Sequence, residues 1–168
     1  MLATLVAFPI LSFLAIIQAA VVSRLPLLQG TADLVLLVLV AWGLQERVRS
    51  AWQWTVIGGF VIGSISIVPD LVPVGAYLAV TGLVLLVRRR IWETPILAMF
   101  ALTFLGSLVT QASAFLAVSI RGTALPVFDS LRLILLPSLL LNLLLAAPIY
   151  AVIKDLSLIH ISEPTRPY

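Results

Sequence analysis

The sequence predicts an all-α integral membrane protein built as a six-helix transmembrane bundle. Of its 168 residues, 62% are hydrophobic and 10% are charged, and the mean hydropathy is +1.20. The charges lie in short clusters, separated by apolar runs such as 2–23, 94–120 and 133–153. Each of these runs can cross a hydrocarbon core of about 30 Å, which needs roughly 20 helical residues. A soluble domain of this length could not cover so much apolar surface.

The predicted crossings form a single polytopic membrane domain over residues 1–156. The second, third and fourth crossings are short, because 15 helical residues reach only about 23 Å, so the bilayer must thin or the helix ends must snorkel. Residues 157–168 have mixed polarity and two prolines, and we interpret them as a non-native tail. The six crossings are expected near 2–23, 32–45, 53–68, 72–87, 95–119 and 132–153.

The region 53–87 is predicted to contain two helices joined by a tight hairpin. A single helix of this length would be about 52 Å long, too much for one crossing. Pro69 and Pro73 resist helix continuation, and Asp70 between them prefers water.

Basic residues set the predicted orientation. The loops at 47–49 and 88–90 are rich in arginine, and the positive-inside rule places both in the cytoplasm. Lys154 falls on the same face, so both termini are predicted to be cytoplasmic, whereas Arg24, Arg121 and Arg132 lie outside. The tryptophans that flank the two arginine loops are predicted to form an aromatic belt at the membrane interface; they are Trp42, Trp52, Trp54 and Trp92.

The sequence contains no recognisable machinery for catalysis, for a cofactor or for a metal. It has no cysteine, and its one histidine, His160, lies in the predicted tail, which excludes thiolate and histidine metal sites. No phosphate-binding glycine loop, HExxH motif or Ser/His/Asp set is present. No basic stripe interleaved with aromatics predicts a nucleic-acid partner. No predicted span has a charged residue near its centre, which argues against a proton-coupled pump or a charged channel.

Polar residues precede two of the predicted spans and would cap their helices. Asp33 and the pair Asp129–Ser130 stand where they would cap the second and the last helix.

The fifth span has a polar face, which serves either as hydrogen-bonding contact between helices or as the lining of a small-ligand cavity. This face comprises Thr103, Ser107, Thr110 and Ala114, with Gln111 and Ser113 beside it.

Small residues mark predicted helix-packing positions in the third and fourth spans. Gly59 and Gly63 form a GxxxG motif, and Gly75 and Gly82 belong to a second small-residue stripe. Small residues allow helix backbones to approach closely. Packing within the bundle is the favoured interpretation, and a dedicated partner interface is the alternative.

The last span carries the most distinctive pattern of the chain. Ser138 and Asn142 are four residues apart and share a helix face. Pro137 and Pro148 each free a backbone carbonyl, and an Asn in hydrocarbon must find a partner. The face is therefore either a structural polar clamp within the fold or a docking face for another membrane helix. The candidate partner-binding residues are Ser138, Asn142, Tyr150, Asp33 and Asp70.

Several of these stretches together resemble the rod shape-determining protein family MreD. The resemblance covers nearly all of 1–156 and rests on size, on the six predicted spans and on four stretches, of which the last span is the most specific. The stretches are Arg24–Leu28 running to Ala32–Leu37; Gly59–Gly63; Pro73–Gly75; and Leu136–Ser138 through Asn142, Pro148 and Tyr150.

The resemblance implies a fold similar to the substrate-binding subunits of energy-coupling-factor transporters. It also implies a non-enzymatic scaffold of the bacterial cell-elongation complex in the inner membrane, which regulates cell shape and peptidoglycan synthesis. The implied partners are an MreC-like protein, MreB, a RodA-type glycosyltransferase, a class B penicillin-binding protein and membrane lipid. The alternative function is a small-molecule-binding subunit of a vitamin-type transporter, which the polar face of the fifth span and the six-helix size would suit.

Overall fold

The computed structural model is helical throughout the part of the chain that it describes, and no strand occurs there. The described residues are 2–20, 30–45, 48–66, 68–69, 71–89, 94–122 and 127–161. The helices are α1 (Leu2–Ala20), α2 (Leu34–Leu44), α3 (Ala51–Ile65), α4 (Leu71–Arg88), α5 (Pro95–Ile120), α6 (Val127–Ser130), the π-helical segment η2 (Leu131–Leu135) and α7 (Leu136–Ile161). Because α6, η2 and α7 follow one another without a gap, the described part has six continuous helical segments. The prediction of an all-helical protein with six helices is confirmed.

Three of these helices are long and apolar enough to cross a membrane, which supports the predicted membrane protein. They cover Leu71–Arg88, Pro95–Ile120 and Leu131–Ser157. The other apolar helices are shorter, at Leu5–Ala20, Leu34–Leu44 and Ala51–Ile65. The eleven residues of α2 rise only about 16 Å, roughly half of a hydrocarbon core.

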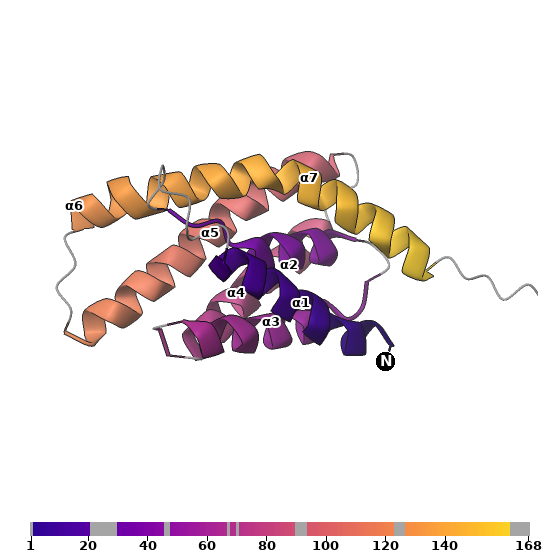
Figure 1. The fold of residues 1–168 in the computed structure, drawn as a ribbon. Helices are drawn as coiled ribbons and strands as arrows, with labels where there is room; N and C mark the ends of the chain where they lie inside the picture. Colours follow the sequence, from indigo (N-terminus) through magenta and orange to yellow (C-terminus); the bar gives the residue numbers. More distant parts are fainter. Residues whose placement is uncertain are drawn as a thin grey trace, which may run out of the picture.

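Helix α2 forms the centre of the molecule. All eleven of its residues are buried, and α1, α3, α4, α5 and α7 all pack against it. A helix that is apolar on every side is stable only where other helices surround it. Figure 1 shows α1 to α4 gathered together, whereas the second half of α5 and the α6 end of the last helical segment extend beyond them.

Helix α4 runs parallel to α2. Tyr77, near the start of α4, contacts Asp33 just before α2, and Arg88, at the end of α4, contacts Gly43 and Gln45 at the end of α2. The two chain regions that carry the predicted cytoplasmic arginine clusters therefore meet at one end of the bundle. This parallel pairing fits a chain that reverses its direction twice between α2 and α4, once before α3 and once after it.

The last helical segment contains the π-helical turn η2 immediately before Pro137. The backbone N–H of Leu136 donates to the carbonyl of Leu131, five residues earlier, and Pro137 has no N–H to continue the ladder.

The last helical segment starts at Val127, so Asp129 and Ser130 lie in its first turn, and their prediction as caps is wrong. At its other end, α7 continues to Ile161, and Ser157, in the predicted tail, is buried and donates to the carbonyl of Lys154 at 2.7 Å.

The predicted aromatic belt is wrong for two of its tryptophans. Trp42 and Trp54 are 5% and 2% exposed, and their rings stack with centroids 4.4 Å apart. They belong to the hydrophobic core where α2 meets α3. Trp52 is 47% exposed, and Trp92 lies outside the described residues.

The predicted packing glycines differ in what surrounds them. A Cβ at Gly59 would lie 2.6 Å from the Cα of Val74, so α3 and α4 touch backbone to backbone there. Gly63 is also buried. A Cβ at Gly82 would meet only the ring of Trp52 at 3.8 Å, and a Cβ at Gly75 would meet nothing within 4 Å.

We expect Gly59→Ala to destabilise the bundle and Gly75→Ala, its matched control, to leave it unchanged or more stable. The added methyl at residue 59 forces α3 away from α4, and such overpacking costs about 1–3 kcal/mol. The methyl at residue 75 meets open space, and Ala is favoured over Gly in a helix by about 1 kcal/mol. Thermal unfolding in detergent micelles measures both; equal midpoints for the two variants would contradict the close contact.

Candidate functional site

The polar side chains of the molecule converge where the chain enters α2. Before this helix, Gly30–Asp33 has no regular structure, so its backbone N–H groups lack helical partners. Thr31 N–H donates to Ser138 Oγ at 3.0 Å, and Asp33 N–H donates to Asn142 Oδ1 at 2.7 Å. Irregular backbone at membrane depth is tolerated only where protein groups or water satisfy it. Two side chains of α7 therefore supply partners for the N–H groups of Thr31 and Asp33.

The first turn of α2 is satisfied in the same way. The N–H of Leu34 donates to Gln18 Oε1 of α1 at 2.9 Å. Asp33 is the N-cap, as predicted, and its Oδ1 accepts from the N–H of Leu36 at 2.9 Å. A carboxylate at this position also compensates the positive end of the helix dipole.

Tyr77 of α4 completes the cap. Its hydroxyl lies 2.9 Å from both Asp33 carboxylate oxygens and donates to them. Tyr77 is only 2% exposed, and its hydroxyl is the donor because a carboxylate has no proton to give. The sequence analysis missed both Tyr77 and Gln18; the only signal was that each is a polar group inside an apolar run.

The two polar residues of the last span are engaged within the chain. Ser138 and Asn142 are 1% and 2% exposed, and Asn142 Nδ2 donates to Ser107 Oγ of α5 at 2.8 Å. Their contacts correspond to the clamp alternative rather than to an outward docking face. Tyr150 is also buried, and Asp70 lies outside the described residues. A partner contact by any of these residues stays a prediction.

Gly30 makes the clamp possible. A Cβ at this position would collide with the backbone nitrogen of Ser138 and lie 2.8 Å from Cβ of Pro137. The irregular segment therefore approaches the backbone of α7 as closely as only a glycine permits.

The polar face of α5 is divided between two environments. Thr103 and Ser107 are buried in the bundle, and Thr103 Oγ1 has no hydrogen-bond partner among the described residues. One turn further on, Thr110, Gln111 and Ser113 line a small cavity. The face therefore makes contact between helices through Ser107 and forms part of a cavity wall further along; that this cavity binds a small ligand stays a prediction.

This cavity lies at the start of α2 and has a volume of about 130 Å³. Polar and apolar groups share its wall about equally, and the polar groups come from α1, α4, α5, the segment before α2 and the residue after α3. The polar lining residues are Gln18, Thr31, Asp33, Ser66, Tyr77, Thr110, Gln111 and Ser113. No group of three or more His, Cys, Asp or Glu side chains that could hold a metal ion occurs in the described ranges.

The other end of α2 is closed by Arg88. One of its guanidinium nitrogens, Nη1, lies 3.2, 2.8 and 3.2 Å from the carbonyl oxygens of Gly43, Gln45 and Val48. A cation at a helix C-terminus satisfies the last carbonyls and compensates the negative end of the dipole. Helix α2 thus has a carboxylate at its start and a guanidinium at its end.

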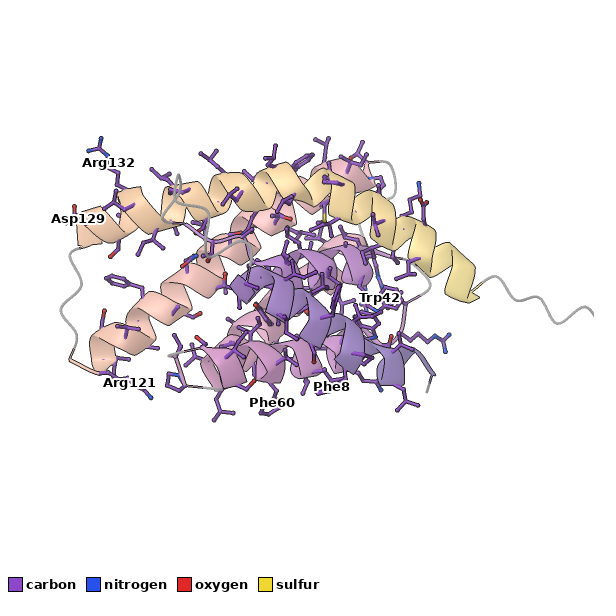
Figure 2. All side chains as sticks on the ribbon, in the orientation of Figure 1. Phe8, Trp42, Phe60, Arg121, Asp129 and Arg132 are labelled. Carbon is purple, nitrogen blue, oxygen red and sulfur yellow. The ribbon has the colours of Figure 1, made fainter. Side chains whose placement is uncertain are left out.

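Two larger apolar grooves lie on the outer surface. One, of about 660 Å³, runs between α1 and α3 past Phe8 and Phe60, whose side chains are labelled in Figure 2. The other, of about 550 Å³, lies between the second half of α5 and the start of the last helical segment. Arg121, Asp129 and Arg132 lie around that projecting end, away from Trp42 (Figure 2).

Comparisons with known proteins add no relative. No protein-family model, no curated protein and no solved structure matches this chain.

We expect Asn142→Leu to lower the stability of the protein while it still inserts into membranes. The change removes the acceptor for the Asp33 N–H and the donor to Ser107, and an unpaired buried polar group costs about 1–3 kcal/mol. The midpoint of thermal unfolding in micelles measures the effect. Leu144→Ala on the same helix, at a side chain that is 72% exposed, is the control; equal midpoints for the two variants would argue against the clamp.

We expect Arg88→Met to destabilise the bundle more than Arg89→Met. The first change leaves three carbonyls at the end of α2 without their donor, at a cost of about 1–2 kcal/mol, whereas the side chain of Arg89 is exposed. Unfolding midpoints of the two variants in the same detergent provide the comparison. An Arg89→Met variant that is the less stable of the two would contradict this role of Arg88.

Proposed function

We propose that the chain is a non-enzymatic scaffold of the bacterial cell-elongation complex, in the inner membrane with both termini cytoplasmic, and that it belongs to the MreD family. The resemblance of the last span supports this proposal. The observation that carries it is the clamped α2, which side chains from α1, α4 and α7 hold at its start and Arg88 holds at its end. A helix fixed at both ends suits a protein that presents a constant shape to partners.

The surface that we propose for partner contact is the groove between α1 and α3. Ser12, Ala15, Ala19 and Ser64 line it together with larger apolar side chains. Membrane helices associate through close packing at small residues, since lipid provides no hydrophobic driving force between them. The proposed occupant is the membrane-spanning segment of an MreC-like protein, and contacts with MreB, the RodA-type glycosyltransferase and the class B penicillin-binding protein would form around it.

The polar face of α5, which would suit a vitamin-type transporter subunit, lines only a small cavity. Sites for small organic ligands usually measure about 300–1,000 Å³, whereas this cavity measures about 130 Å³. A fold similar to energy-coupling-factor substrate-binding subunits is part of the proposal and does not by itself require such a ligand.

We expect Ser64→Phe to reduce copurification of an MreC-like partner at least about tenfold, because the new ring fills the α1–α3 groove and removes its close packing surface. Ser64 is exposed, and Ser119→Phe, at an exposed position of α5 outside the grooves, is the matched control. Affinity purification of the tagged protein in mild detergent, followed by quantitative mass spectrometry, gives the measurement.

The unmodified protein in the same experiment tests the wider proposal. Recovery of the MreC-like protein and of the cell-wall synthases would support the scaffold. Recovery of a stoichiometric vitamin-like molecule with an ATPase module would replace it with the transporter function. Equal recovery from the two serine variants would overturn the proposed groove alone.

A further inference from the structure

The polar cavity at the start of α2 has the composition of a cation site. Among the described residues that line it, Asp33 is the charged one, and none of them is Lys or Arg. Carboxylates within membrane proteins are costly, and they mark ion or proton sites more often than inert positions. The carboxylate is held in place by Leu36 N–H and the Tyr77 hydroxyl, so it is preorganised at the cavity wall.

Two neutral hydroxyls that line the cavity together with Asp33 donate their protons to backbone carbonyls. The hydroxyl of Thr110 donates to the Ser107 carbonyl at 3.2 Å, and that of Ser113 donates to the Thr110 carbonyl at 2.8 Å. Each hydroxyl has one proton, and Tyr77 has used its own on Asp33. The oxygens of these side chains therefore offer lone pairs to an occupant, in the manner of ligands of hard cations.

Charge and volume restrict the occupant further. One carboxylate balances a single positive charge, whereas protein sites for divalent ions commonly combine several carboxylates. A cavity of about 130 Å³ holds roughly four water molecules, at about 30 Å³ each. This space suits a partly hydrated alkali ion or a compact primary ammonium group.

We propose that this cavity binds a small monovalent cation, with Asp33 as the charged ligand and the Thr110 and Ser113 hydroxyl oxygens as neutral ligands. Such an ion would tie together α4, α5 and the start of α2. The proposal does not rest on the scaffold function, because it concerns the isolated protein.

The test is ion-dependent stability of the full chain in nanodiscs of zwitterionic lipid. Sodium chloride replaces choline chloride at constant ionic strength, and thermal unfolding together with ²³Na NMR line broadening reports binding. We expect a saturable rise of the unfolding midpoint, since a ligand that binds only the folded state stabilises it. Potassium chloride and methylammonium chloride in parallel titrations distinguish an inorganic ion from an ammonium group.

Three variants test whether the ion binds in this cavity. Asp33→Asn keeps a good N-cap residue and should weaken the response at least about tenfold, because charged ligands form the strongest contacts. Ser113→Ala retains the charge and should weaken it several-fold. Asp129→Asn, at an exposed carboxylate in the first turn of the last helical segment, should respond like the unmodified protein.

Three results would overturn the proposal. Identical midpoints in all four salts would mean that the cavity holds water only. An unchanged response of Asp33→Asn would assign the effect to general salt. A response that Ser113→Ala retains in full would place the ion outside the cavity, and this comparison does not depend on whether Asp33→Asn folds.

Discussion

The structure depends on the hydrogen bonding of a short irregular segment inside a membrane protein. Gly30–Asp33 enters α2 with backbone N–H groups that no helix satisfies. Hydrocarbon offers no water to replace those partners. Ser138 and Asn142 of α7 accept from Thr31 and Asp33, and Gln18 of α1 accepts from Leu34, the first residue of α2. Helix α2 is short and wholly enclosed because this arrangement holds its start within the bundle.

The same hydrogen bonds bear on the two interpretations of the polar residues in the last span. On a helix considered alone, Ser138 and Asn142 fit an outward docking face as well as an internal contact. In the fold they bond to the segment before α2 and to α5. Surfaces that partners can reach are then the apolar grooves, where close packing rather than hydrogen bonding would determine specificity.

Two charged side chains lie at the ends of α2, where each has the sign opposite to that end of the helix dipole. Asp33 lies at its positive end and Arg88 at its negative end, so each charge is stabilised by the helix dipole and by direct hydrogen bonds. At the Asp33 end, the Thr110 and Ser113 hydroxyls donate to α5 carbonyls at the wall of a small cavity. At the Arg88 end, the guanidinium Nη1 donates to the backbone carbonyls of Gly43, Gln45 and Val48.

The sequence by itself determined the helical class, the six segments, the α3–α4 hairpin and the capping role of Asp33, because apolar run length, proline position and cap chemistry are local properties. It did not determine that α2 is buried on every side, that Trp42 and Trp54 stack in the core, or that Tyr77, Gln18 and Arg88 complete the ends of α2. Those contacts join residues distant along the chain, at separations such as 44 between Asp33 and Tyr77 and 109 between Asp33 and Asn142. Only packing of the helices around α2 decides which polar groups meet, since each group is locally compatible with several partners.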